Sequence, residues 1–541
     1  MPTVLVDGKE IELAAGERLN GIQVAERTGI DIPRYCWHPG LSVVASCRMC
    51  LVETGTRDPK TGAITMLPKL VPACQTPATD NTVFVTNSEK VERSRAMVEE
   101  DLLIDHPIDC PICDKAGECY LQDYHFKYGQ DARRADVRPF TSRRREMGDT
   151  VTLFVDRCVM CTRCVRFTRE ITGSSELFVI NRGSHEEIDV FPGFPLDNKM
   201  SGNVVDLCPV GALGDKDFLY QQRVWFMKQH EGVCTGCSTG CSINVEENLD
   251  TVYRLKPRTN PHVNQWWMCD EGRYGFHYVH SDKRLTNVER RRKGDALTLL
   301  EWSQVVREID EQFRALGRVA ALLSPHLTVE EAYLLAKYIR QVDPRGLIAL
   351  GPVPVEGTDE TFKNGFTIHA EKCPNRRGVE EVVKYFMRRV PTVDDVLSAI
   401  DAGQVAALWV SGGYHSEWIT PATAERLAAV GCLVVQDLFA SPLLDVATYR
   451  LPGAAFAERE GSYVNHADRL QSVEWAIRPP AGVRVEGSVY HELHAIPGLA
   501  NARKVLTEVA QTIPFFAAAL EPVDPLGVDL KAAVPQTATT T

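Results

Sequence analysis

The first residues of the chain alternate between apolar and polar positions. In TVLVDGKEIEL, residues 3–13, this alternation continues on both sides of an Asp-Gly pair. A period of two is typical of a strand with one buried face, and Asp-Gly favours a tight hairpin turn. The segment RLNGIQVAERTG, residues 18–29, follows as a predicted short helix, with Gly29 where the helix would stop. A hairpin and then a helix are therefore predicted at the N-terminus.

From about residue 283 the pattern changes to apolar strands that alternate with helices. VAALLS (319–324) precedes the helical segment TVEEAYLLAKYIRQV (328–342), and the strand-like GLIAL follows it. The same order returns in VAALWVSGG, TPATAERLAAVG and CLVVQDL. Nearly continuous apolar strands between helices are typical of a parallel sheet that is covered on both faces. The second half is therefore predicted to be an α/β domain.

Length and charge narrow the class of protein. A chain of 541 residues is too long for one hydrophobic core, so several domains are expected. The net charge of -12 and the pI near 5.7 argue against nucleic acid as a partner. Neither a run of eighteen apolar residues nor a signal-peptide pattern is present. We therefore expect an intracellular protein that reaches a membrane only by docking to other subunits.

Cysteine usage indicates the chemistry. Fifteen of the seventeen cysteines lie between Cys36 and Cys269. An odd number of thiols without a signal peptide favours metal binding over disulfides. Of the other two, Cys432 opens an apolar run and is predicted to be a buried strand residue, and Cys373 is predicted to be inert.

The spacing divides the fifteen cysteines into four groups. The first group is Cys36, Cys47, Cys50 and Cys74; the second group is Cys110, Cys113 and Cys119; the third group is Cys158, Cys161, Cys164 and Cys208; and the fourth group is Cys234, Cys237, Cys241 and Cys269. The third group has the CxxCxxC run and distant Cys-Pro of a bacterial [4Fe–4S] ferredoxin. Small residues between the thiols of the fourth group would let the backbone curl and point its amides at sulfur.

The first group follows the predicted hairpin and helix, and this order resembles the β-grasp domain of plant-type [2Fe–2S] ferredoxins. Its spacing differs from their C-x4-C-x2-C, so the cluster type rests on the resemblance. Structural zinc also binds four thiolates in CxxC pairs and is the alternative for any single group. Four groups within 240 residues, one of them a CxxCxxC triple, favour iron–sulfur clusters.

The second group lacks a fourth thiol. Three residues separate His106 from Cys110, and this spacer would set its imidazole within reach of the cysteine loop. A histidine near cysteines is more often a surface residue, and that alternative stays open on spacing alone. The other nearby histidines are predicted to be non-ligands, because the neighbouring groups already have four thiolates; they are His38, His125, His185 and His262.

Five segments together resemble the large iron–sulfur subunit of respiratory complex I, NADH:quinone oxidoreductase. In chain order they are YCWHPGLSVVASCRMCLVE, HPIDCPICDKAGECYLQDY, CVMCTRCVRFTREITG, GNVVDLCPVGAL and CTGCSTGC. The resemblance covers residues 1 to about 285. It implies one [2Fe–2S] cluster on the first group and one [4Fe–4S] cluster on each of the others. It also implies that His106 is the fourth ligand of the second group.

The expected function is electron relay. The resemblance implies a flavin- and NADH-binding subunit with its [2Fe–2S] partner upstream, and ferredoxin-like and quinone-site subunits downstream. It also implies a peripheral place on the cytoplasmic face of the bacterial inner membrane. The sequence has no G-x-G-x-x-G for NADH and no evident catalytic residues, so this chain is not expected to bind NADH itself.

The second half contains FAEREGSYVNHADRLQ, residues 456–471, which resembles a stretch near the end of molybdopterin oxidoreductase domains. This half is much shorter than a catalytic molybdenum subunit, and no metal-ligand context is evident in it. We therefore expect a shortened domain of that fold without molybdopterin. Two alternatives remain: a molybdenum- or tungsten-dependent formate dehydrogenase-type subunit, and the diaphorase subunit of a soluble hydrogenase.

The predicted fold class is multidomain, α+β and α/β. The expected domains are, in order, a [2Fe–2S] β-grasp domain (1–84), a [4Fe–4S] domain with one histidine and three cysteine ligands (85–140), a [4Fe–4S] ferredoxin-like domain (141–222), a molybdopterin-oxidoreductase-type [4Fe–4S] domain (223–282), a shortened α/β molybdopterin-oxidoreductase-like domain (283–515) and a disordered tail (516–541).

Overall fold

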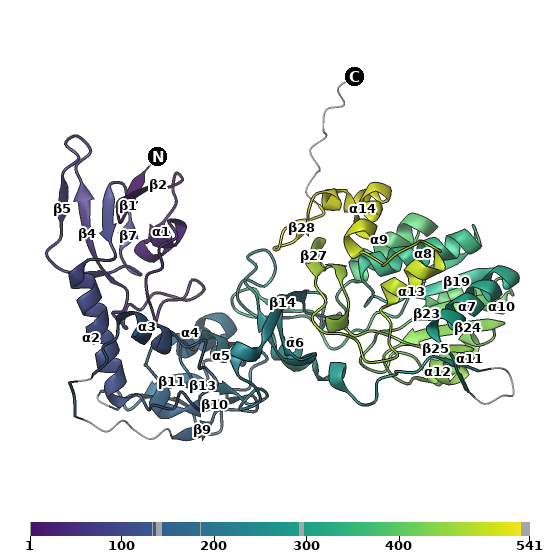
Figure 1. The fold of residues 1–541 in the computed structure, drawn as a ribbon, viewed down its shortest axis with the longest axis horizontal. Helices are drawn as coiled ribbons and strands as arrows, with labels where there is room; N and C mark the ends of the chain where they lie inside the picture. The colour runs from purple at the N-terminus through teal and green to yellow at the C-terminus, as the bar shows by residue number, and fades with distance from the viewer. Residues whose placement is uncertain (1, 133, 137–142, 184, 292–296, 532–541) are drawn as a thin grey trace. The chain divides into compact units, whose positions relative to one another are not determined.

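A computed structural model describes residues 2–132, 134–136, 143–183, 185–291 and 297–531. The chain divides into two compact units (Figure 1). Unit 1 comprises Met1–Met227 with Phe362–Gly365, and unit 2 comprises Lys228–Thr361 with Phe366–Thr541. The first three cysteine groups belong to unit 1 and the fourth belongs to unit 2.

The predicted N-terminal hairpin and helix are confirmed. Strands β1 (Thr3–Val6) and β2 (Lys9–Glu12) pair antiparallel across Asp7 and Gly8. Both turn residues have positive φ, 48° and 81°, which explains the Asp-Gly pair. Helix α1 (Gly21–Arg27) begins at the side-chain cap of Asn20 and ends before Gly29, whose φ is 77°.

This hairpin belongs to a six-stranded mixed sheet of order β2-β1-β8-β4-β5, with β6 on β4. Strands β1 and β8 are parallel, and α1 packs on β1 as expected for a β-grasp domain. The loop that connects α1 to β4 carries three cysteines of the first group, Cys36, Cys47 and Cys50. The remaining strands are β3 (Leu19–Asn20), β4 (Leu51–Arg57), β5 (Ile64–Met66), β6 (Val71–Pro72), β7 (Pro77–Ala78) and β8 (Thr82–Val85).

The rest of unit 1 consists of short elements that carry the second and third cysteine groups. Its helices are α2 (Glu89–Asp105), α3 (Tyr120–Tyr128), α4 (Arg163–Phe167) and α5 (Asn203–Leu207), with short helical turns η1 (Val155–Arg157), η2 (Thr168–Thr172) and η3 (Val224–Phe226). Its strands are β9 (Arg144–Glu146), β10 (Val151–Phe154), β11 (Leu177–Ile180), β12 (Glu187–Val190) and β13 (Leu213–Asp215).

Unit 2 begins with an antiparallel sheet, β14 to β16, that supports the fourth cysteine group. The elements here are β14 (Lys228–Val233), β15 (Ser242–Asn248), β16 (Thr251–Pro257), α6 (Asp270–Tyr274) and η4 (His277–His280). The loop from β14 to β15 carries three cysteines of the fourth group, and the remaining one immediately precedes α6.

The core of unit 2 is a seven-stranded sheet of order β18-β17-β25-β24-β23-β19-β20. The predicted parallel sheet is confirmed for the five strands from β25 to β20. The short edge strands β17 and β18 are antiparallel, which the sequence did not indicate. The strands are β17 (Glu289–Arg290), β18 (Thr298–Leu299), β19 (Val319–Leu323), β20 (Leu347–Leu350), β23 (Ala407–Ser411), β24 (Cys432–Asp437) and β25 (Tyr449–Pro452).

Helices cover both faces of this sheet. Alternate residues of β19 accordingly pack into two separate apolar clusters, one on each face. Cys432 is fully buried in β24, as predicted. The helices are α7 (Trp302–Leu316), α8 (Val329–Val342), α9 (Arg376–Met387), α10 (Val393–Asp401), α11 (Pro421–Leu427), α12 (Pro442–Val446), α13 (Glu486–Leu493) and α14 (Ala502–Thr512), with η5 (Phe456–Glu458) and η6 (Pro514–Leu520). The small strands are β21 (Glu360–Thr361), β22 (Thr367–Ile368), β26 (Gly461–Val464), β27 (Arg469–Val473) and β28 (Val528–Asp529).

The disordered tail predicted for residues 516–541 was placed too early in the chain. Within 516–541, Phe516 is fully buried in η6, and β28 pairs with β27. Apolar packing and strand pairing therefore order residues 516–531, whereas 532–541 lie outside the described residues.

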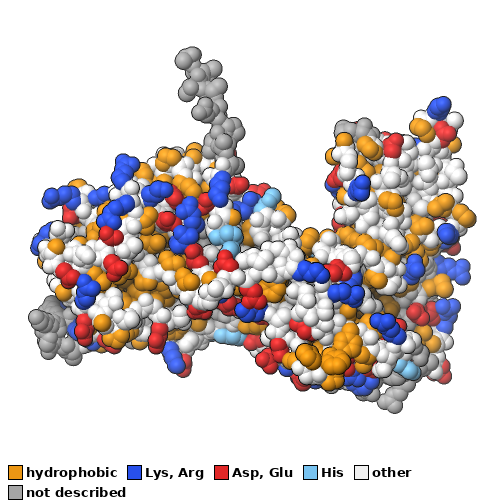
Figure 2. All heavy atoms as spheres, turned by 180° about the vertical axis from the view of Figure 1, so that it is seen from behind, with side chains coloured by type: hydrophobic (Ala, Val, Ile, Leu, Met, Phe, Trp, Pro, Cys, Tyr) orange, Lys and Arg blue, Asp and Glu red, His pale blue; other side chains and the backbone are white. Residues whose placement is uncertain are grey.

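Among the described residues, no helix is both long and apolar enough to cross a bilayer. Figure 2 shows acidic and basic side chains interspersed on the face that it draws.

Candidate metal centres

The structure brings the four thiols of the first group together. Cys36 and Cys47 form one hydrogen-bonded pair of thiols, Cys50 and Cys74 form the other, and the pairs interact electrostatically. Three of the four residues are almost fully buried, and Cys47 is less so. The group has the donors and the protection from water that a thiolate-bound cluster requires.

The second group lies where α2 ends and α3 begins. His106 is the C-cap residue of α2, and Cys119 is the N-cap residue of α3. Both residues and Cys110 line one cavity of about 540 Å³. The remaining member of the group, Cys113, lies close to the other two cysteines, and its thiol interacts electrostatically with the thiols of Cys110 and Cys119.

His106 has the properties of a nitrogen ligand. Burial, with a smaller contribution from the Arg157 cation, lowers its pKa to about 4, so the imidazole is neutral at pH 7. Its Nδ1 is buried and has no hydrogen-bond partner among the described residues. A neutral imidazole with an unsatisfied nitrogen can bind a metal, so the residues present fit a three-thiolate, one-imidazole site.

The third group surrounds an apolar hollow. All four of its thiols line this space together with apolar side chains, among them Leu153, Ile188 and Val210. Met160 and Thr162 have φ values of 46° and 58°, and these left-handed conformations curl the backbone within the CxxCxxC run. Burial raises the pKa of the Cys161 thiol to about 11, while the cations of Arg163 and Arg166 oppose this rise.

The fourth group depends on glycine for its close packing. The ideal Cβ of a side chain at Gly272 would lie 2.7 Å from Cys234 Sγ, so a larger residue would displace that thiol. The Gly272 amide donates to Cys269 Sγ at 3.4 Å. Gly272 lies outside the run of thiols, and the predicted amide-to-sulfur contact within that run is the hydrogen bond from the Gly236 amide to the Cys234 thiol. Cys234 N–H donates to Cys241 O at 2.8 Å and closes the loop that carries the other thiols.

Among the described residues, no three His, Cys, Asp or Glu side chains converge closely enough to ligate one metal ion. An iron–sulfur cluster instead distributes its cysteines over different iron atoms. In the third group, all four thiols line one hollow.

Direct backbone contacts join the second and third groups. Tyr120, which follows Cys119, donates its N–H to the carbonyl of Pro209, which follows Cys208, at 2.9 Å. A side chain at Gly211 would begin only 2.1 Å from Cys113 Sγ, so that turn lies directly against the second group.

Two arginines of α4 join the first and third groups. Arg166 Nη2 donates to the carbonyls of Cys36 and Cys161. Arg163 donates to Trp37 O at 2.6 Å and to Leu207 O at 3.2 Å. Sequence reasoning did not identify these arginines, although both lie beside Cys164 in the third group. The sequence signal that could have identified them was the presence of two cationic residues within a metal-binding motif.

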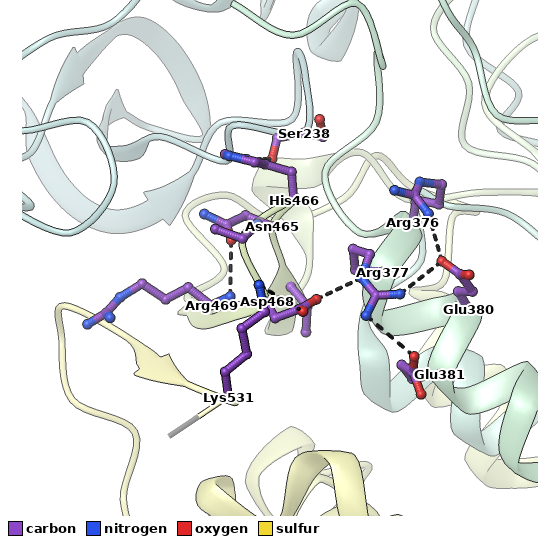
Figure 3. Close-up of polar contacts among 12 residues, drawn as sticks. Ser238, Arg376, Arg377, Glu380, Glu381, Asn465, His466, Asp468, Arg469 and Lys531 are labelled. Atoms are coloured by element: carbon purple, nitrogen blue, oxygen red, sulfur yellow. Dashed lines mark hydrogen bonds and ion pairs between the residues drawn. The ribbon is translucent and has the colours of Figure 1, made fainter. Parts of the chain in front are cut away.

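Residues 456–471 contact the fourth group. Asn465 Nδ2 donates to Thr239 O at 3.1 Å, and Gln471 Nε2 donates to Gly240 O at 2.8 Å. The Ser238 carbonyl accepts from the His466 N–H at 2.9 Å, and Figure 3 shows these two residues side by side. The polar side chains of this stretch therefore hold the loop that carries the cysteines.

Arg377 anchors the same turn from α9. Its guanidinium forms ion pairs with Asp468 at 2.7 Å, with Glu380 at 3.1 Å and with Glu381 at 3.4 Å (Figure 3). Lys531 also approaches Asp468 at 3.3 Å. The turn between β26 and β27 is thus fixed on the side away from the cysteine loop.

Replacing Gln471 by Ala should loosen the fourth group. The change removes the donor to Gly240 O and the acceptor of the Ser242 hydroxyl, which lies 2.7 Å away. Leaving buried polar groups unsatisfied costs about 1–3 kcal/mol. We expect a lower midpoint of unfolding and loss of iron from this group, measured by denaturation and by iron analysis. Gln404→Ala, an exposed glutamine, is the control. Equal iron retention in both variants would contradict the assigned role of Gln471.

Comparison with known protein families gives matches whose order along the chain is that of the cysteine groups. Five family descriptions match: 2Fe-2S iron-sulfur cluster binding domain (2–89), NADH-ubiquinone oxidoreductase-G iron-sulfur binding region (95–134), NADH-quinone oxidoreductase subunit 3, ferredoxin-like domain (148–214), Molybdopterin oxidoreductase Fe4S4 domain (227–281) and Molybdopterin oxidoreductase (380–495). The predicted fold class, with ferredoxin-like, [4Fe–4S] and molybdopterin-oxidoreductase-like parts, is confirmed.

Curated relatives align with more than half of this chain. A subunit of the NADH-quinone oxidoreductase of Rickettsia felis is 33% identical over 339 residues, 62% of this chain and 48% of that protein. The mitochondrial NADH-ubiquinone oxidoreductase 78 kDa subunit of Neurospora crassa is 36% identical over 339 residues, 61% of this chain and 43% of that protein. The chain thus spans about half the length of the curated relatives it matches. A crystal structure of NAD+-reducing [NiFe]-hydrogenase, at 26% identity and a TM-score of 0.34, covers 41% of this chain and 91% of that one.

Proposed function

The matched part of this chain is similar to the large iron–sulfur subunit of NADH-quinone oxidoreductase, and from that similarity we propose that the protein relays electrons between clusters held by its four cysteine groups. The proposed ligands are the four thiols of the first, third and fourth groups, and His106 with the three thiols of the second group. The clusters would be one [2Fe–2S] and three [4Fe–4S], which supply one-electron carriers when bound. Apart from the tail boundary corrected above, the domain boundaries predicted from the sequence belong to the same proposal.

The adjacency of the three groups in unit 1 carries this proposal. The first and third groups share a guanidinium nitrogen of Arg166, and the second and third share the contact from Tyr120 to Pro209. Electron tunnelling falls steeply with distance, so carriers must be neighbours. The residues of this chain position the carriers, exclude water from them and supply fixed charges around them.

The proposal includes no molybdopterin. The polar residues of the molybdopterin-oxidoreductase-like stretch already have partners within the chain: Asn465 and Gln471 bind the cysteine loop, and Arg469 donates to Leu526 O and Gly527 O. Arg459 is paired with Glu331 and Glu486. These contacts support a scaffold role for unit 2. Recovery of a pterin from the folded, purified protein would contradict it.

The proposed partners are a flavin- and NADH-binding subunit with its [2Fe–2S] protein upstream, and ferredoxin-like and quinone-site subunits downstream. The protein would then lie peripherally on the cytoplasmic face of the bacterial inner membrane, as part of a membrane-associated complex.

Reduction by NADH with and without partners tests this function. The native complex, isolated through a tag on this chain, should contain flavin, and NADH should reduce the clusters of the chain within it, as detected by EPR. The chain alone should be reduced by dithionite but not by NADH. Reduction of the isolated chain by NADH, or a native complex without flavin, would contradict the proposal.

A further inference from the structure

Two buried cations lie between the first and third cysteine groups. Arg163 and Arg166 lie on α4 and are only 4% and 5% exposed. The hydrogen bonds of each guanidinium go to main-chain oxygens next to or within both groups, and the guanidinium of Arg163 also lies over the Tyr120 ring. Arg166 binds Cys36 O and Cys161 O, while Arg163 binds Trp37 O and Leu207 O, next to Cys36 and Cys208.

Within the described part of the chain, neither guanidinium forms an ion pair with a carboxylate, and the Nε of each is buried without a partner. Glu170, whose oxygens accept from the amide and hydroxyl of Ser42, attracts Arg166 electrostatically but forms no ion pair with it.

Burying a cation without an ion-pair partner is strongly unfavourable. Carbonyl dipoles solvate the two arginines in part but do not neutralise them. Together with its four thiolates, an iron–sulfur cluster carries a net charge of about −2 when oxidised and about −3 when reduced by one electron. Clusters bound by the first and third cysteine groups would therefore supply the negative charge that balances the two arginines.

We propose that Arg163 and Arg166 are positioning residues that act as shared counter-ions of the first and third clusters, raising the reduction potentials of both. This inference rests on the proposed function. Because reduction adds a negative charge, a fixed cation stabilises the reduced form more than the oxidised form. Because one guanidinium is shared, its charge acts on both clusters, and neither potential can be set independently of it.

The test is an EPR redox titration of the full chain, purified anaerobically with its clusters, comparing Arg166→Gln, Arg166→Lys and wild type. Gln keeps hydrogen-bond donors but removes the charge, so the midpoints of the first and third clusters should both become more negative. We expect an effect of about tenfold in the electron-transfer equilibrium, ~59 mV for one electron. Lys keeps the charge and should restore most of the shift.

Arg169→Gln is the matched control. Arg169 follows α4 closely and undergoes the same change in charge, but its side chain is exposed. Solvent screens such a charge, so its removal should leave both midpoints in place. Arg163→Gln should act in the same direction as Arg166→Gln. If Arg166→Gln disrupts a cluster, the comparison is made with Arg163→Gln and the two lysine variants, Arg163→Lys and Arg166→Lys.

The outcomes separate this inference from the function on which it rests. Intact cluster signals whose midpoints do not move in the Gln variants overturn the counter-ion role and leave electron relay standing. Equal shifts in the Lys and Gln variants also overturn it, because they indicate a geometric effect instead of a charge effect. Absence of iron–sulfur signals from wild type would overturn the proposed function itself.

Discussion

Replacing His106 by Ala should remove or degrade one cluster and leave three intact. The imidazole is the proposed fourth donor of a group that has only three thiols, and its buried Nδ1 has no hydrogen-bond partner among the described residues. Its loss opens one iron to water, so loss of the cluster or its conversion to a three-iron form is expected. The other groups have four thiols each and should keep their signals.

His106→Cys is the conservative counterpart. A thiolate in place of a neutral imidazole adds a negative charge to the cluster, so four irons should be retained and the midpoint should become more negative. EPR redox titration and iron analysis of both variants give the measurement. His125→Ala is the control, since this histidine lines the same cavity but is not a proposed ligand. If His106→Ala leaves every signal and midpoint unchanged, His106 is not a ligand.

Replacing Arg459 by Met should strongly destabilise unit 2. Arg459 binds Glu331 at 2.8 Å and Glu486 at 3.0 Å, and all three side chains are buried. Removing the only cation of this trio leaves two carboxylates facing each other in the interior. Removing one partner of a buried pair costs about 3–5 kcal/mol. Chemical denaturation of the full chain should show a loss of this size at neutral pH.

The loss should grow with pH. Burial raises the pKa of Glu486 to about 7 even with Arg459 present. A carboxyl with a raised folded pKa keeps its proton in the fold but loses it in the unfolded chain, so stability falls as pH rises from about 4.5 through 7. Without the guanidinium this pKa should rise further. The gap between variant and wild type should therefore be larger at pH 8 than at pH 5.5.

Arg426→Met is the control for Arg459. Its pair with Asp401 is exposed on both sides, 53% and 57%, so its removal should change stability by less than about 1 kcal/mol. Equal effects of the two substitutions would contradict the importance of the buried trio.

Local sequence patterns predicted the elements well. The N-terminal hairpin and the strands β19, β23 and β24 follow from apolar periodicity and turn residues, which act over a few positions. The antiparallel edge strand β17 has only two residues, too few to give a pattern. The order around Phe516 depends on tertiary burial, which composition alone does not reveal.

The cysteine groups were predictable because metal ligands recur at short spacings. Their supporting contacts were not, because the partners are far apart in sequence. Arg166 and Cys36 are separated by 130 positions, and Gln471 and Gly240 by 231. Only the fold shows that these polar side chains meet the backbone of a cysteine loop.

Counting metal in the purified protein tests the central claim most directly. The chain, isolated or reconstituted under anaerobic conditions, should hold about fourteen iron atoms, in one [2Fe–2S] and three [4Fe–4S] clusters. Iron and sulfide analysis combined with EPR of the reduced protein gives both the number and the types. The account predicts that total and the signals of both cluster types. Markedly fewer irons in well-folded protein, or zinc in their place, would contradict it.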